Sequence, residues 1–196
     1  MGNLQAFLSS RMAWITGEQV MKPIETERLF LRDLVASDQD AVHEFSSDPE
    51  VVRFMDWGPN TKDETIGFIK RSISARNEKP RHNYTLAIIQ KDTGKLIGSC
   101  RIVVSNVENR EGWLGYCLNR NFWGKGYATE TTRGLMKFGF EKLNLHRLFA
   151  LCDPGNSASA HVLEKSGMKK EGHLREHKWS KGKWRDSYLY AILEQD

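Results

Sequence analysis

The chain lacks any hydrophobic run long enough to cross a bilayer. No apolar stretch approaches the roughly 18 residues that a membrane-spanning helix needs. The N-terminus has no basic segment followed by a continuous apolar core, so we do not expect a secretory signal. These two absences predict a cytoplasmic protein without a membrane partner.

Cysteine is scarce, and its spacing excludes several kinds of site. Cys100, Cys117 and Cys152 each lie in an apolar stretch, and none forms a CxxC pair. Structural thiols in a reducing compartment are the expectation for such residues. The sequence also has no cluster with metal-ligand spacing and no cysteine spaced with histidine as a nucleophile pair. We therefore expect neither a metal nor a cysteine-based covalent intermediate.

Length and charge fit one globular domain. The chain has 196 residues, of which 39% are hydrophobic and 28% are charged. The net charge of +4 favours an anionic ligand but does not by itself indicate nucleic acid. Residues 1–20 resemble an N-terminal extension, either a short docking helix or a frayed end, and the domain spans residues 21–196.

The spacing of apolar residues predicts alternating strands and helices. This order is typical of an α/β fold with a mixed sheet and helices on both faces. Strands are predicted at 29–34, 84–90, 96–104, 113–118, 147–151, 169–179 and 184–193, and helices at 37–45, 61–77, 127–142 and 156–167.

The most informative segment is the turn at 119–130, between a predicted strand and a long helix. Its glycines remove side chains where the backbone must approach a ligand. The first N–H groups of the helix lack intrahelical partners, so with the helix dipole and Lys125 they suit a phosphate or pyrophosphate. A purely structural turn remains the alternative. A P-loop is excluded because Gly126 follows Lys125, and a dinucleotide fingerprint because Thr129 stands at its third glycine.

The neighbouring motifs give this turn a family. With it, the segments 24–32, 113–118, 156–168, 171–175 and 184–186 resemble the GCN5-related N-acetyltransferase (GNAT) superfamily, and within it the ribosomal-protein alanine N-acetyltransferases (RimJ/RimL-like). The resemblance covers about residues 22–194. It implies the GNAT fold, with a mixed, mostly antiparallel sheet of six to seven strands and helices on both faces.

The resemblance also implies acetyl-CoA as co-substrate. The family loop Q/R-x-x-G-x-G/A maps onto Trp123, Gly126 and Ala128, where Trp123 departs from the usual Gln or Arg. The preceding strand is implied to splay from its parallel neighbour and to offer its edge to the pantetheine arm. The implied acetyl-CoA residues are Cys117, Leu118, Trp123, Gly124, Lys125, Gly126, Tyr127, Ala128, Thr129, Asn156 and Ser159.

The catalytic assignments are less defined. Ser159 matches a serine that contacts the CoA sulfur in the ribosomal branch, although both it and Asn156 also suit an ordinary helix start. The tyrosine acid of many relatives is replaced by Leu163. Glu111 and Glu176 are the candidate bases; each also suits a solvated surface, and the closer alignment of the second lands on Lys178.

The acceptor is left open between the N-terminal alanine of a ribosomal protein and a small amine such as a polyamine or amino acid. Its pocket is expected between the first two helices and the C-terminal hairpin, with residues 54–57 either lining it or packing in the core. A monomer or homodimer is expected. The competing function is an RNA-binding module, set against a solvated turn with core-facing tryptophans, and both depend on Lys178, Trp179, Lys181, Lys183, Trp184 and Arg185.

Overall fold

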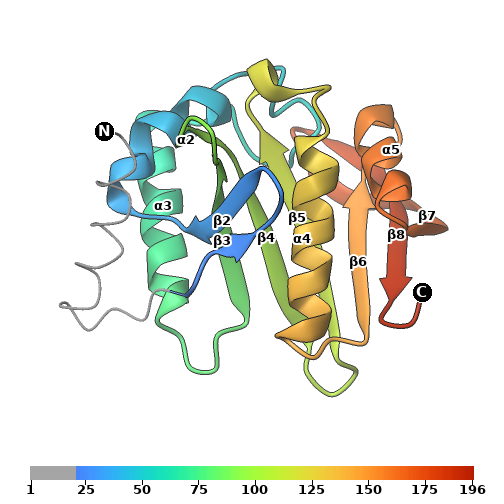
Figure 1. The fold of residues 1–196 in the computed structure, drawn as a ribbon. Helices are drawn as coiled ribbons and strands as arrows, with labels where there is room; N and C mark the ends of the chain where they lie inside the picture. Colours follow the sequence, from blue (N-terminus) through green and yellow to red (C-terminus); the bar gives the residue numbers. More distant parts are fainter. Residues whose placement is uncertain (1–20) are drawn as a thin grey trace.

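One mixed sheet of eight strands forms the centre of the molecule (Figure 1). The protein was analysed as a computed structural model, which describes residues 21–196. The strand order is β1-β2-β3-β4-β5-β6-β8-β7, and only β5 and β6 pair in parallel. The strands are β1 (Ile24–Glu25), β2 (Leu29–Asp33), β3 (Asn83–Gln90), β4 (Leu96–Asn106), β5 (Glu111–Leu118), β6 (Arg147–Cys152), β7 (Lys169–Ser180) and β8 (Lys183–Leu193).

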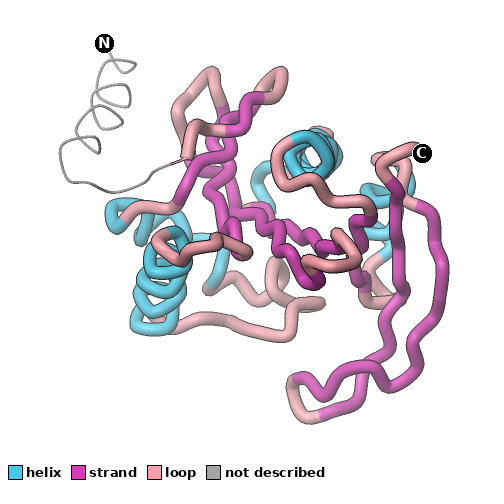
Figure 2. Tube along the Cα trace, turned by 90° about the horizontal axis from the view of Figure 1, so that it is seen from below, coloured by secondary structure: helices cyan, strands magenta, loops and turns pink. Residues whose placement is uncertain are grey.

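Helices cover both faces of the sheet, as predicted (Figure 2). On one face the buried side chains of α4 and α5 join the larger core, and on the other those of α2 and α3 form a smaller one. The helices are α2 (Gln39–Ser46), α3 (Lys62–Arg76), α4 (Tyr127–Glu141) and α5 (Ser157–Lys165), with 3₁₀ turns η1 (Ala36–Asp38) and η2 (Arg120–Phe122).

The predicted fold class is confirmed, with one strand more than the six or seven expected. The missed strand is β1, which has two residues and pairs with β2 through Ile24 and Leu31. Two residues are too few to show an alternating pattern, so this strand could not be predicted from periodicity. The expectations for residues 1–20 lie outside the described residues.

Strand β3 shows why the sheet needs a helical layer on each face. Successive side chains of a strand point to opposite faces. Leu86 and Ile88 accordingly enter the larger core, while Ala87 and Ile89 enter the smaller one. The apolar run of β3 is therefore buried on both sides.

The parallel pair β5 and β6 separates part of the way along its length. Pairing is confined to Glu111–Trp113 on β5 and Arg147–Phe149 on β6. Beyond this point β5 stays paired with β4 as far as Leu118, and β6 stays paired with β8 as far as Cys152. The two strands diverge towards their C-terminal ends (Figure 1). The predicted splay is present, and it leaves one edge of β5 without a ladder partner.

The close approach of β4 and β5 at this point should be sensitive to added volume. A Cβ at Gly98 would lie against the carbonyl oxygen of Cys117 and 3.0 Å from Cα of Leu118. Because both are backbone atoms, the end of β5 would have to move. We expect Gly98→Ala to lower the free energy of unfolding by about 1–3 kcal/mol in urea denaturation.

The matched control is Gly115→Ala on the facing strand. Its new Cβ would meet only the Trp113 ring, at 3.9 Å. We expect this variant to stay within about 0.5 kcal/mol of the wild type. Equal stability of the two variants would contradict the packing argument.

Candidate active site

The turn between β5 and α4 presents a row of backbone donors. Gly124 and Gly126 have φ angles of +72° and +80°, which favour glycine. The first hydrogen bond of the helix runs from Glu130 N–H to the Gly126 carbonyl, at 3.0 Å. In the described part of the chain, no N–H group from Gly124 to Thr129 donates a hydrogen bond. Six free donors at a helix start are an arrangement that suits an anion.

Arg28 holds this turn against the sheet. Its Nε lies 2.7 Å from Oε2 of Glu130, and its Nη1 donates to the Lys125 carbonyl at 3.0 Å. The guanidinium also lies 4.6 Å from the centre of the Tyr127 ring. The Glu130 carboxylate accepts a second bond, at 2.6 Å, from the Thr26 hydroxyl. Sequence reasoning missed this brace because its halves are about a hundred residues apart.

The side chain of Lys125 makes contacts within the turn itself. Its Nζ donates to the Asn121 carbonyl at 2.9 Å and lies 5.3 Å from the centre of the Phe122 ring. The ammonium group therefore adds positive charge at the turn from a fixed position. The predicted loop residues Trp123 to Thr129 are contiguous in space as well as in sequence.

Fewer backbone groups of β5 face the gap between β5 and β6 than predicted. Asn119 N–H donates to the Ile97 carbonyl at 2.9 Å, and bonded pairs alternate along an antiparallel ladder. The backbone of Cys117, which pairs with Ser99, therefore faces β4. The groups that face the splay belong to Tyr116 and Leu118. This corrects the expectation that the Cys117 backbone is free, and the cofactor contacts themselves stay predictions.

Trp123 occupies part of that edge. Its indole N–H donates to the Leu118 carbonyl at 2.8 Å. The residue that departs from the family Gln or Arg thus ties the turn back to the end of β5. The Leu118 N–H and the Tyr116 backbone remain as the groups facing the gap.

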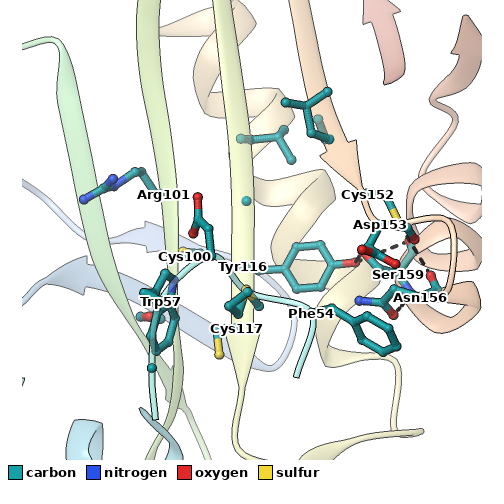
Figure 3. Close-up of a pocket in the computed structure, with 18 of the residues that line it drawn as sticks. Phe54, Trp57, Cys100, Arg101, Tyr116, Cys117, Cys152, Asp153, Asn156 and Ser159 are labelled. Carbon is teal, nitrogen blue, oxygen red and sulfur yellow. Dashed lines mark hydrogen bonds between the residues drawn. The ribbon is translucent and has the colours of Figure 1, made fainter. Parts of the chain in front are cut away.

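A cavity of about 940 Å³ extends from the splay to the helices α2 and α3. Residues 54–57, expected either in a pocket or in the core, line it. The cavity also reaches the start of α5. In Figure 3, Arg101 and Trp57 lie on one side of Tyr116, and Ser159 and Asn156 lie on the other.

A pair of hydroxyl groups faces the cavity beside the splay. The Tyr116 hydroxyl lies 3.1 Å from Oγ of Ser159 (Figure 3). Ser159 N–H donates to Oδ1 of Asn156 at 3.1 Å, so Asn156 is the N-cap of α5. Burial raises the pKa of Tyr116 well above its usual value, so the phenol keeps its proton.

Tyr116 brings a phenol from β5 to Ser159, whereas α5 itself carries no tyrosine. Leu163, at the position where the sequence resemblance implied a tyrosine in many relatives, lines the cavity. In the sequence, Tyr116 is one residue of the strand motif 113–118. A signal was available: a tyrosine in a strand next to a predicted splay is a candidate for a hydroxyl that reaches the gap.

Neither carboxylate predicted as the base lies in the cavity. Glu111, at the start of β5, forms an ion pair with Arg147 at 3.1 Å. Glu176 lies in a bulge of β7 with a φ of +49°, and its N–H donates to Asp186 at 2.9 Å. Among the described residues, the carboxylates that line the cavity are Asp56, Glu64, Asp153 and Asp186.

Most of the cavity carboxylates are already engaged. Asp153 pairs with Arg185 at 2.6 Å, and Asp186 lies 2.7 Å from Nε2 of His173. The bond from the Glu176 N–H, followed by that from His173, lowers the pKa of Asp186, so its carboxylate stays ionised. Lys178, which the closer alignment indicated, lines the cavity and lies 3.5 Å from Asp56.

The cysteines do not supply a nucleophile. Cys117 lines the cavity, but burial raises the pKa of its thiol to about 12. Burial likewise raises the pKa of Cys152, which donates to the carbonyls of Asp153 and Asn156 at 3.4 Å. Thiols in this state are poor nucleophiles at neutral pH. Over residues 21–196 no group of His, Cys, Asp or Glu side chains is arranged to hold a metal, and no helix could span a membrane.

The hairpin of β7 and β8 lies at one end of the sheet (Figure 2), and residues near its turn contact the rest of the protein. Its tryptophans do not face the core, which corrects one sequence-based expectation. Trp179 and Trp184 are 62% and 56% exposed and contact each other edge to face, with 5.5 Å between their ring centres. Lys181 is engaged within the protein and donates to the Val52 carbonyl at 2.8 Å.

The comparisons identify the class of protein to which this splayed parallel pair and free helix start belong, the acetyltransferases. Residues 28–169 match the family model described as "Acetyltransferase (GNAT) domain". The Bacillus licheniformis protein "Uncharacterized N-acetyltransferase p20" is 35% identical over 90% of this chain and 98% of its own length. The chain therefore belongs to the GNAT family and is an N-acetyltransferase.

Solved structures share the fold. A GNAT-family acetyltransferase from Bacillus anthracis has a TM-score of 0.79 and 31% identity, covering 89% of this chain and all of that one. RimL, a ribosomal L7/L12 alpha-N-protein acetyltransferase, has a TM-score of 0.78 at 21% identity, covering 89% and 94%. A Vibrio cholerae spermidine N-acetyltransferase in complex with CoA and spermine has a TM-score of 0.73 at 22% identity, covering 86% and 96%.

The buried phenol of Tyr116 should be visible by titration. We expect its phenolate absorbance, taken as the difference between wild type and Tyr116→Phe, to appear only above the ordinary pKa near 10. Burial penalises the phenolate, so the folded protein holds the proton more tightly than the unfolded chain does. The stability from this group is complete below about pH 10 and falls as the pH rises further.

The same difference spectrum in urea is the internal control. There Tyr116 should titrate near pH 10. Titration at that pH in the folded protein would show that the hydroxyl is not desolvated.

Proposed function

We propose that this chain transfers acetyl from acetyl-CoA directly to a primary amine in a ternary complex. The observation that carries the proposal is the row of six free N–H donors from Gly124 to Thr129 next to the unpaired edge of β5. This combination suits a ligand that has a diphosphate at one point and an extended amide-bearing arm beyond it. The CoA complex of the spermidine acetyltransferase supports the same co-substrate.

In this proposal the diphosphate binds at Gly124–Thr129, and the pantetheine arm runs along Tyr116 and Leu118. Asn156 contacts the arm from the other side of the splay. The acetyl group then reaches the cavity beside Ser159, where the backbone edge of β5 can donate to the carbonyl oxygen. Trp123 supports this arrangement because it holds the turn at the end of β5.

The chemistry needs little from the protein beyond positioning. The amine nitrogen attacks the thioester carbonyl, a C–N bond forms, and the C–S bond breaks to release the thiolate. An α-amine with a pKa of about 7.7–8.0 is partly neutral at pH 7 and loses its remaining proton to water or to a cavity carboxylate such as Asp56. Ser159, with Tyr116 behind it, donates a hydrogen bond to the leaving sulfur.

The acceptor named by the sequence resemblance, the N-terminal alanine of a ribosomal protein, remains part of the proposal. RimL shares the fold and acts on a ribosomal protein, whereas the spermidine acetyltransferase shares it and acts on a polyamine. The fold therefore accommodates both classes, and the acceptor has to be argued from the cavity.

Binding of acetyl-CoA should depend on the left-handed backbone at Gly126. A side chain there costs about 1–2 kcal/mol of strain, and a new Cβ would lie 3.3 Å from Nη2 of Arg28. We expect Gly126→Ala to raise the Kd for acetyl-CoA about tenfold in calorimetry. Turnover on a panel of N-terminal peptides and small amines should fall in parallel at low acetyl-CoA.

Gly94→Ala is the matched control. Gly94 has a φ of +68° in the turn between β3 and β4, with no atom within 4 Å of a new Cβ. Gly94→Ala should lower the free energy of unfolding about as much as Gly126→Ala does but leave acetyl-CoA binding unchanged. Wild-type protein that neither binds acetyl-CoA nor acetylates any amine would refute the proposed function.

Ser159 should affect the chemical step more than binding. Loss of a hydrogen bond to a charged group costs about 1.5–3 kcal/mol, so we expect Ser159→Ala to lower kcat about ten- to a hundredfold. Ser157→Ala, an exposed position on the same helix, is the control. A covalent acetyl-enzyme trapped on the pathway would contradict direct transfer.

A further inference from the structure

Two arginines in the cavity form no direct ion pair with a carboxylate among the described residues. Arg71 of α3 and Arg101 of β4 both line it. In the described part of the chain, no carboxylate forms an ion pair with either of them. The other two basic side chains of the cavity do have partners, in the pairs Lys178–Asp56 and Arg185–Asp153.

Arg101 is held in place without being neutralised. Its Nε donates to the Thr85 hydroxyl at 2.8 Å, and its guanidinium lies 5.9 Å from the centre of the Trp113 ring. Burial, and then the charge of Arg71, lowers the pKa of Arg101 from its usual value, and the charge of Asp56, which pairs with Lys178, opposes this only in part. A guanidinium nevertheless stays protonated at neutral pH. Two cations are therefore kept within electrostatic range of each other in a partly desolvated space.

The strand register sets the distance from these charges to the reaction. Cys100 lies opposite Tyr116, and Arg101 lies opposite Gly115. Neighbouring strands are about 4.8 Å apart, so Arg101 begins one strand away from the edge proposed for the thioester. Gly115 has no side chain to fill the space beside it, and Trp113 is its nearest neighbour. A ligand group held by Arg101 would lie only a few bonds from the reacting amine.

We propose that Arg101 and Arg71 bind a carboxylate of the acceptor. The acceptor is then an amine with a carboxylate a few bonds away, as in a free amino acid or a peptide with an acidic residue near its N-terminus. A guanidinium suits a carboxylate because it can donate two parallel hydrogen bonds to the two carboxylate oxygens. A polyamine would bring further positive charge towards the two arginines. This inference rests on the proposed acetyl transfer and names its acceptor.

The test compares matched acceptors. Alanine is compared with alaninamide, and a peptide beginning Ala-Glu with one beginning Ala-Gln; spermidine is the polyamine arm. We expect kcat/KM to be at least about tenfold higher for the carboxylate member of one pair, since hydrogen bonds to charged groups are worth about 1.5–3 kcal/mol. The pair that shows the preference tells a free amino acid from an acidic peptide.

Arg101→Gln should abolish that preference. It should lower kcat/KM for the carboxylate acceptor about ten- to a hundredfold and leave the amide acceptor and the KM for acetyl-CoA unchanged. Arg101→Lys keeps the positive charge but loses the paired N–H donors of the guanidinium, so it should retain part of the preference. Arg175→Gln, an exposed arginine on β7 outside the cavity, should retain all of it.

Calorimetry of the same ligands with CoA-saturated protein separates the two proposals. Carboxylate binding that is lost in Arg101→Gln supports this inference even if no acceptor is turned over, a result that would count against the proposed function alone. Spermidine as the best substrate, or carboxylate and amide acceptors bound equally, would overturn the inference and leave acetyl transfer intact.

Discussion

The separation of β5 from β6 after Trp113 is the constraint on which the rest of the site depends. Buried backbone groups need hydrogen-bond partners, so a strand that loses its neighbour inside a sheet must find others. The Leu118 carbonyl finds one in the Trp123 indole, and the start of α5 brings Ser159 to the Tyr116 hydroxyl. The remaining groups on this edge are open to a ligand. Had the strands stayed paired, there would be neither a cavity nor an edge to bind an extended arm.

A second consequence of the splay is that donors, rather than acids, surround the proposed sulfur position. The raised pKa of Tyr116 makes its phenol a weak acid. A thiolate whose conjugate thiol has a pKa of about 8.5 would not take the phenol's proton readily. The phenol is better suited to polarise Ser159 than to ionise. A leaving thiolate needs only a hydrogen bond from Ser159, because the basicity of a thiolate is low. The absence of a tyrosine at Leu163 is therefore no obstacle to acetyl transfer.

The sequence predicted what is local and missed what is assembled from distant residues. The turn at Gly124–Thr129 was predicted because glycine spacing and a helix start lie in one segment. The brace from Arg28 to Glu130 and the reach of Tyr116 to Ser159 depend on tertiary contacts that no short pattern encodes. The two carboxylates predicted as the base lie outside the cavity for the same reason. Glu111 and Glu176 lie near the expected strands in sequence, but Glu111 pairs with Arg147 and Glu176 lies in a bulge of β7. The tryptophans of the hairpin were expected to face the core because they are apolar, but they are exposed.

The charge distribution separates the two ends of the proposed ternary complex. The diphosphate would meet backbone donors beyond Leu118, whereas Arg71 and Arg101 lie in the cavity on the α3 side of Tyr116. The turn residues do not line that cavity in the described structure, so the co-substrate phosphates would not neutralise the arginines there. Like charges that share a partly buried space repel each other, and the cavity carboxylates Asp56 and Asp153 already pair with Lys178 and Arg185. A carboxylate on the proposed acceptor would therefore relieve the repulsion between Arg71 and Arg101 in the working complex.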